Sequence, residues 1–183
     1  YICDYMTNSL EESMISRIEL YLSERKMNEA AERADDLVTV GNKDPIAWYE
    51  KAKVLYLNDK FDDSIYCLKM GLDIDKTPAE LWQLVGYNML AVQKFSEAVE
   101  ALEYVKTMQP RNAEAVAALA LAYLYAGTLT RFEFNLKYAM DIDRIRAMKV
   151  IINFFERGVE KNPSIANEQR ESARAAIQNL LGK

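Results

Sequence analysis

Apolar side chains recur through most of the chain at the three- and four-residue intervals that place them on one face of an α-helix. Trp82, Val85 and Met89 follow this spacing. The same pattern predicts one helix over residues 11–24 and another over residues 27–40. The chain is therefore predicted to be all-α and built of short helices.

The helical pattern repeats with a period of 34 residues. Trp82 aligns with Trp48, and Gly86 aligns with Ala52 and Ala120. The register continues without an insertion through four consecutive windows, which are residues 11–44, 45–78, 79–112 and 113–146. Such a period is typical of helical repeat proteins, in which each unit packs only against its neighbours.

A turn between two helices is predicted inside every window, at residues 25–26, 59–60, 93–94 and 127–128. Glycine at position 127 permits a positive φ without steric cost. Pro45, Pro78 and Pro110 are predicted to lie in the connections between units, where a missing N–H does no harm. One small residue at a fixed position in six of the predicted helices permits the two helices of a unit to approach closely. These residues are Ala52, Gly86 and Ala120 in the first helices and Ala30, Ser64 and Ala98 in the second.

Residues 79–112 resemble the tetratricopeptide repeat (TPR), whose signature is W-x2-L-G-x2-Y…A-x3-F…P. Trp82, Gly86, Ala98 and Pro110 match it, while Val85, Met89 and Leu102 replace its leucine, tyrosine and phenylalanine. The resemblance extends from Glu11 to about Asp143. It implies a right-handed α-solenoid of helix-turn-helix TPR units closed by a C-terminal capping helix.

The two ends depart from the repeat. Residues 1–10 are interpreted as a lead-in helix from an earlier repeat or as a loose end, and Ser9 followed by Glu12 predicts a capped helix start near Leu10. Because the first residue is not Met, we expect a fragment or a processed form. Residues 147–183 are expected to form a degenerate fifth unit and then a capping helix that starts at Pro163.

The residues needed for most catalysis are missing. The chain has no histidine, which removes the commonest general base and metal ligand, and its six glycines form no phosphate-binding loop. The paired carboxylates Asp35–Asp36 and Asp62–Asp63 are better explained as solvated acids on helix surfaces and first turns. We therefore predict no catalytic residue, no metal, no cofactor and no enzymatic activity.

The overall composition of the chain argues against some classes of partner. The net charge of −5 and the pI of about 5.0 argue against a nucleic-acid binder, and no apolar run is long enough to span a membrane. Cys3 and Cys67 lie far apart without metal-like spacing, so we expect reduced thiols and a cytoplasmic protein.

In the TPR family, side chains from the first helix of each unit line a concave groove that binds peptides. The resemblance implies a groove rich in tyrosine and leucine, with an acidic rim at Glu12, Glu80 and Glu114. The candidate peptide-binding residues are Tyr49, Lys53, Tyr56, Gln83, Tyr87, Leu90, Leu121 and Leu124. The alternative is that these side chains pack against one another or, for the last two, against the chain's own C-terminal segment.

Chaperone-cofactor relatives grip a C-terminal carboxylate with a set of basic and amide side chains on successive helices. The matching positions here are Tyr49, Lys53, Leu84, Glu114 and Ala118, of which only Lys53 is positive. The carboxylate clamp of chaperone-type TPR proteins is therefore predicted to be absent.

The leading hypothesis is a protein-interaction scaffold that binds a peptide or helix of a protein partner. One alternative is a self-assembling homo-oligomer, suggested by the apolar Phe154–Phe155 face and by a charge of −9 over residues 1–143 against +4 over residues 144–183. The other is a regulatory arm of a larger enzyme.

Overall fold

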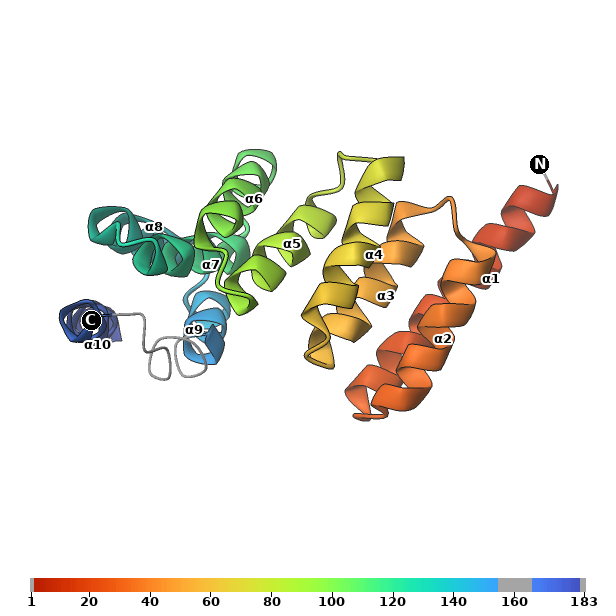
Figure 1. The fold of residues 1–183 in the computed structure, drawn as a ribbon, viewed down its shortest axis with the longest axis horizontal. Coiled ribbons are helices and arrows are strands. Elements are labelled where there is room, and N and C mark those ends of the chain that lie inside the picture. Colours follow the sequence, from red (N-terminus) through yellow and green to blue (C-terminus); the bar gives the residue numbers. More distant parts are fainter. Residues whose placement is uncertain (1, 155–165, 182–183) are drawn as a thin grey trace. The chain divides into compact units, whose positions relative to one another are not determined.

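The computed structural model describes residues 2–154 and 166–181, and within these ranges it is helical with no strand (Figure 1). The helices are α1 (Ile2–Ser23), α2 (Met27–Val40), α3 (Pro45–Leu57), α4 (Phe61–Ile74), α5 (Ala79–Ala91), α6 (Phe95–Met108), α7 (Ala113–Tyr125), α8 (Leu129–Ile142), α9 (Arg144–Phe154) and α10 (Asn167–Leu181). The predicted all-α fold is confirmed.

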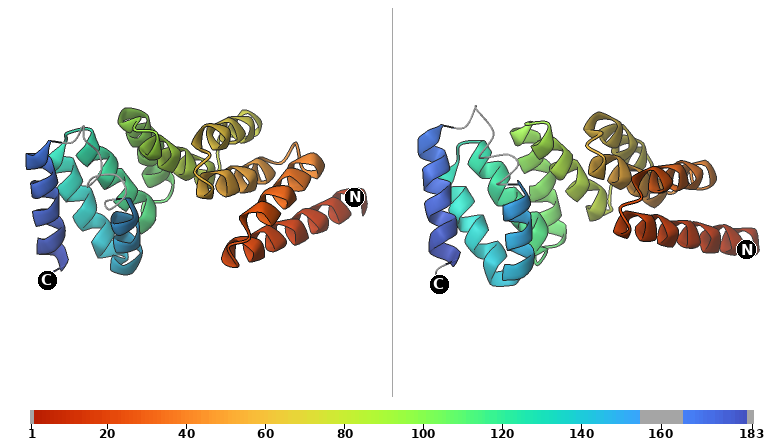
Figure 2. Two further views of the ribbon diagram at one scale, coloured as in Figure 1. Left: turned by 60° about the horizontal axis from the view of Figure 1, so that its bottom comes forward. Right: turned by 90° about the horizontal axis from the view of Figure 1, so that it is seen from below.

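The chain divides into two compact units, Tyr1–Leu84 (unit 1) and Val85–Lys183 (unit 2), with the division inside α5. In unit 1, α1 packs on α2, α2 on α3, and α3 on α4. In unit 2, α7 packs against α6, α8 and α9, and α10 lies beside α8 (Figure 2). Each predicted turn therefore joins two helices, while the assignment of four repeat units and a terminal cap stays a prediction.

The four predicted turns share one backbone conformation. Arg25, Asp59, Gln93 and Gly127 have φ values of 58°, 58°, 63° and 80°. In each turn the following N–H closes back on the helix: Lys26 donates to the Tyr21 carbonyl at 2.8 Å, and Thr128 donates to the Tyr123 carbonyl at 2.8 Å. This is the Schellman arrangement, in which a left-handed residue satisfies the last carbonyls of a helix. Three of the four positions adopt it without glycine.

The small-residue positions lie where paired helices touch. Ala52 of α3 and Ser64 of α4 are both fully buried, and the Ser64 hydroxyl donates to the Ala52 carbonyl at 2.8 Å. In unit 2, a Cβ added to Gly86 would lie 2.5 Å from Cγ of Leu102. Paired helices can approach this closely only where small side chains lie at the contact.

Two local predictions were wrong. The helix α1 runs without a break from Ile2, so Ser9 lies inside it and does not cap a start near Leu10. Pro45 is the first residue of α3 and not part of the connection, because the first turn of a helix needs no N–H from that residue. The carboxylate of Asp44 caps this helix by accepting from the Ile46 N–H at 2.8 Å.

The C-terminal predictions are only partly covered by the structure. The helix α9 overlaps the beginning of the region predicted to be a degenerate fifth unit, and α10 corresponds to most of the predicted capping helix. Pro163 and Phe155 lie outside the described residues.

The shared turn conformation predicts opposite effects at equivalent positions. Gln93→Gly should stabilise the protein by about 0.5 kcal/mol, because glycine removes the steric cost of a left-handed residue but loses more backbone entropy on folding. Gly127→Ala should destabilise it by about 1 kcal/mol. Urea unfolding measures both, and Gln93→Ala, which keeps the Cβ, is the matched control with no gain expected. Destabilisation by Gln93→Gly would contradict this interpretation.

The contact between α5 and α6 predicts that Gly86→Ala destabilises the protein by about 1–2 kcal/mol. Alanine favours a helix over glycine by about 1 kcal/mol, but its Cβ would displace the branched end of Leu102. Thermal or urea unfolding of Gly86→Ala, Leu102→Ala and the double variant provides the check. The double variant should lose less stability than the sum of the single variants, since the space vacated at Leu102 accepts the new methyl.

Candidate functional site

In unit 1, one side of α1 and one side of α3 together form a surface. The helix α1 contacts α3 directly. Side chains on α1 recur at spacings of four and three, and those on α3 at the same spacings. We call this surface the α1–α3 face; it consists of Ile15, Glu19 and Leu22 from α1 and Tyr49, Lys53 and Tyr56 from α3.

Lys53 is the electrostatic centre of the α1–α3 face. Its ammonium forms ion pairs with Glu19 of α1 and, at 2.7 Å, with Glu50 of its own helix. It also lies 5.4 Å from the centroid of the Tyr49 ring, within range of a cation–π contact. A single cation thus ties the two helices together.

The pKa values on this face reflect burial and pairing. Burial lowers the pKa of Lys53, but its hydrogen bonds to Glu19 and Glu50 outweigh burial and raise the pKa above its ordinary value. Glu50 is only 5% exposed, and burial raises its pKa although Lys53 opposes the change. Both groups therefore depend on each other to remain charged inside the fold.

Tyr49 and Tyr56 are half-buried. Burial raises the pKa of the Tyr49 phenol, Lys53 opposes this change, and the negative charges of Glu50, Glu80 and Glu19 add to it. Tyr49 therefore lies in an acidic environment with contributions from three helices. The Tyr56 ring packs on the Phe61 ring at a centroid distance of 5.7 Å. Gln83 lies half-buried on α5, within unit 1.

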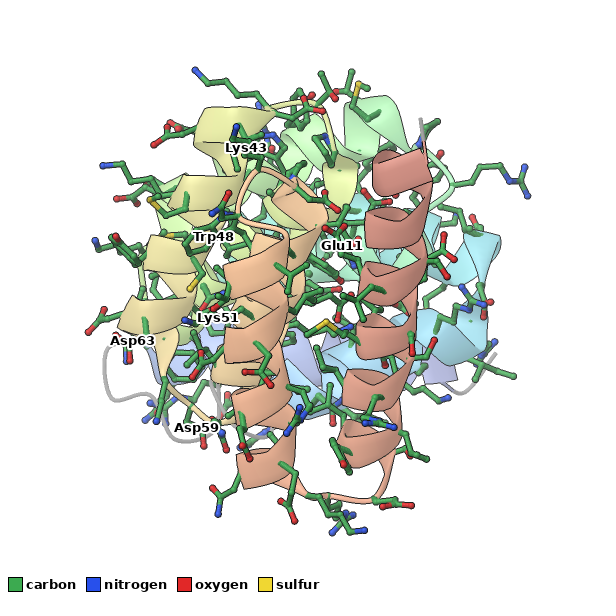
Figure 3. The ribbon with its side chains drawn as sticks, turned by 90° about the vertical axis from the view of Figure 1, so that its right-hand side faces the viewer. Glu11, Lys43, Trp48, Lys51, Asp59 and Asp63 are labelled. Atoms are coloured by element: carbon green, nitrogen blue, oxygen red, sulfur yellow. The ribbon has the colours of Figure 1, made fainter. Side chains whose placement is uncertain are left out.

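Lys51 and Lys53 lie two residues apart on α3 and form ion pairs with different neighbouring helices. Lys51 pairs with Asp35 of α2 at 2.9 Å, and Figure 3 shows it in the region of α2 and α4. Asp62 and Asp63 lie exposed in the first turn of α4, and Asp36 pairs with Arg33 at 2.9 Å. The paired carboxylates occupy helix surfaces and a first turn, as predicted.

The predicted binding residues of unit 2 are mostly covered by their own chain. Leu90 is 6% exposed, Leu124 is 2% exposed and Leu121 is not exposed at all. The Tyr87 ring packs on the ring of Phe154, at the end of α9, at a centroid distance of 5.5 Å. The alternative of packing within the chain therefore describes these side chains better than a free binding surface does.

The contact with α9 is reinforced by Tyr125. Its hydroxyl donates to the Phe154 carbonyl at 3.2 Å, and its ring stacks on Phe95 at 4.8 Å. Burial raises the pKa of the Tyr125 phenol. Phe154, proposed from the sequence as part of a self-assembly face, thus makes intramolecular contacts.

Of the predicted residues, the structure brings Tyr49 and Lys53 into direct contact and leaves Tyr56 partly exposed on the same helix. Sequence reasoning missed the pairing of Lys53 with Glu19. The two residues are 34 positions apart and carry opposite charges, so the repeat register already contained the signal.

No metal-type site is evident within residues 2–154 and 166–181, since no group of three or more His, Cys, Asp or Glu residues gathers there. Cys67 is a buried free thiol whose pKa is raised, mainly by burial. None of the described helices has the length and apolar character needed to cross a membrane.

Comparison with known proteins supports the fold. No protein-family model and no curated protein matches the chain. Among solved structures, MamA from Desulfovibrio magneticus RS-1 superposes with a TM-score of 0.70 at 17% identity, covering 96% of this chain and 94% of MamA. Pseudomonas aeruginosa PilF gives a TM-score of 0.71 at 14% identity, covering 94% and 77%. YrrB, a TPR protein with an unusual peptide-binding site, gives 0.62 at 14% identity, covering 92% and 89%.

The chain has the fold of TPR proteins. The likeness covers nearly the whole chain and agrees with the 34-residue repeat in its sequence. At these identities it establishes the TPR fold and leaves the binding site of this chain to be argued from its own residues.

The Lys53 network makes a pH-dependent prediction. At pH 7, Lys53→Met should destabilise the protein by about 1–3 kcal/mol, because Glu50 loses its partner in a buried place while the exposed Glu19 loses little. The raised pKa of Glu50 means that the folded state binds a proton more tightly than the unfolded state. The cost of ionised Glu50 therefore appears as the pH rises above the ordinary glutamate pKa of 4.5 and vanishes below it.

Urea unfolding of Lys53→Met at pH 7 and pH 3.5 tests this account, with Glu50→Gln/Lys53→Met as the matched control. The double variant should recover most of the stability at pH 7. An equal loss at both pH values would show that Lys53 contributes through packing rather than charge.

Proposed function

We propose that this protein is a non-enzymatic protein-interaction scaffold that binds a peptide or helix of a partner on the α1–α3 face of unit 1. The observation that carries the proposal is the difference in exposure between equivalent repeat positions. Tyr56 is half-buried and its neighbour Leu57 is 52% exposed, whereas Leu90 and Leu124, at the same position as Tyr56 in the next two repeats, are covered. The α1–α3 face keeps aromatic and apolar surface available to a partner.

The chemistry of this face suits a protein ligand. Tyrosine offers a large contact area at low entropy cost and a hydroxyl for hydrogen bonding, which is why it is frequent at binding surfaces. Ile15 and Leu22 of α1 are half-buried, pack in part against the core of unit 1, and add their remaining apolar area to this face. A segment that places one or two apolar side chains against these residues would exclude water from both partners.

Two further observations support the proposal. YrrB, a protein of the same fold, is described as having a peptide-binding site. The absence of histidine from the whole chain weighs against an active site on this face.

We expect Tyr56→Ala to lower the affinity for a partner peptide at least tenfold, which corresponds to about 1.4 kcal/mol. The probe is a phage-displayed library of random peptides of about twelve residues, a length that spans a short helix or strand. Selected peptides are synthesised, and their affinity is measured by fluorescence anisotropy.

Tyr66→Ala is the matched control, because Tyr66 is a tyrosine on α4 that is 61% exposed. Circular dichroism and thermal unfolding confirm that both variants remain folded. Peptides that bind Tyr56→Ala and the parent chain equally well would remove the α1–α3 face as the binding site, and failure to select any peptide would count against the scaffold proposal itself.

A further inference from the structure

We infer that the segment recognised by the α1–α3 face is basic, with lysine or arginine side chains beside its apolar anchors. This inference rests on the proposed function and adds the chemical class of the partner. It follows from how the charges of unit 1 are arranged around Tyr49 and Tyr56.

Carboxylates dominate the α1–α3 face and its border. Glu19 is exposed on α1, and Glu12 lies two turns earlier on the same side of that helix by its spacing of seven residues. Glu80, exposed at the start of α5, acts electrostatically on Tyr49, as Glu19 does. Tyr49 therefore has acidic groups contributed by α1 and α5 as well as by its own helix.

The only cation on the α1–α3 face is already engaged. Lys53 is paired with both Glu19 and Glu50, and its side chain is 21% exposed. An incoming acidic side chain or C-terminal carboxylate would have to compete with two internal carboxylates for one ammonium. It would also meet the exposed carboxylates of Glu12 and Glu80.

A basic segment would be attracted where an acidic segment is repelled. Exposed carboxylates attract a lysine or arginine side chain over about 10 Å at moderate salt and speed its encounter with the face. Tyrosine rings also accept cations, as the position of Lys53 at 5.4 Å from the Tyr49 centroid shows. Charge and aromatic surface thus favour the same class of side chain.

A second copy of this chain is the competing occupant. The helix α9 exposes Ile145 (71%), Lys149 and Ile152 (46%) at spacings of four and three, which is a short basic and apolar stripe. We favour a partner protein because the stripe offers only two apolar anchors, less than the contact that stable association needs. The test includes the second copy as an outcome.

The first measurement uses the peptides selected from the random library whose binding depends on Tyr56. We expect lysine and arginine to be enriched in them over aspartate and glutamate, and their affinity to fall at least tenfold between about 50 mM and about 500 mM salt. Tyr56-dependent peptides that are neutral or acidic would overturn this inference and leave the proposed function standing. Absence of Tyr56-dependent peptides would overturn the proposed function.

The second measurement removes charge at constant volume. The double variant Glu19→Gln/Glu80→Gln should lower the affinity for the basic peptides about three- to tenfold. Glu97→Gln/Glu133→Gln is the control, because it removes two exposed charges from α6 and α8 in unit 2 and should leave affinity unchanged. If both variants weakened peptide binding equally, the peptides would be attracted to the acidic chain as a whole. That result would overturn the assignment of the basic segment to the α1–α3 face.

Sedimentation velocity of the parent chain decides the question of the second copy. We expect one species whose sedimentation does not change with concentration or with Lys149→Glu. Self-association that is lost in both Lys149→Glu and Glu19→Gln/Glu80→Gln would assign the α1–α3 face to a second copy and overturn the inference.

Discussion

Close contact between paired helices is the constraint on which the rest of the structure depends. Within unit 1, Ala52 and Ser64 bring α3 and α4 together, and within unit 2, Gly86 accommodates Leu102. The left-handed turns, which recur every 34 residues, fix how each helix returns along the previous one. The side chains of α1 and α3 that these packing contacts leave at the surface are the ones that can face a partner.

The repeat pattern made the fold predictable because its determinants are local. The turn at Asp59 and the small residue at Ala52 each depend on neighbours within a few residues or on one adjacent helix. The start of α1 was mispredicted because Ser9 has the residue type of a cap but lies within a helix that begins earlier. A capping pattern indicates only that a helix can start there, and the preceding residues decide whether it does.

The candidate site was less predictable because exposure depends on packing far along the chain. Tyr87 and Leu121 occupy the same repeat position as Lys53, yet Tyr87 packs on Phe154 and Leu121 is fully buried. Nothing in the 34-residue signature distinguishes them, since α9, which packs on α7 and contacts Tyr87 through Phe154, begins only where the repeat pattern in the sequence fades. The ion pair of Lys53 with Glu19 was foreseeable in principle, because equivalent positions in successive repeats lie on adjacent helices. The inference that the partner is basic also depends on Glu50, which pairs with Lys53 and whose burial could not be read from the sequence.

The proposed function requires that a partner segment binds along α1 and α3 of unit 1. Mapping the amide chemical shifts of the isotope-labelled chain during titration with a selected peptide tests it most directly. We expect the largest changes in chemical shift on residues 12–22 and 46–57 and only small changes on α6 and α8. Dominant changes on α6 and α8, with α1 and α3 unaffected, would contradict it.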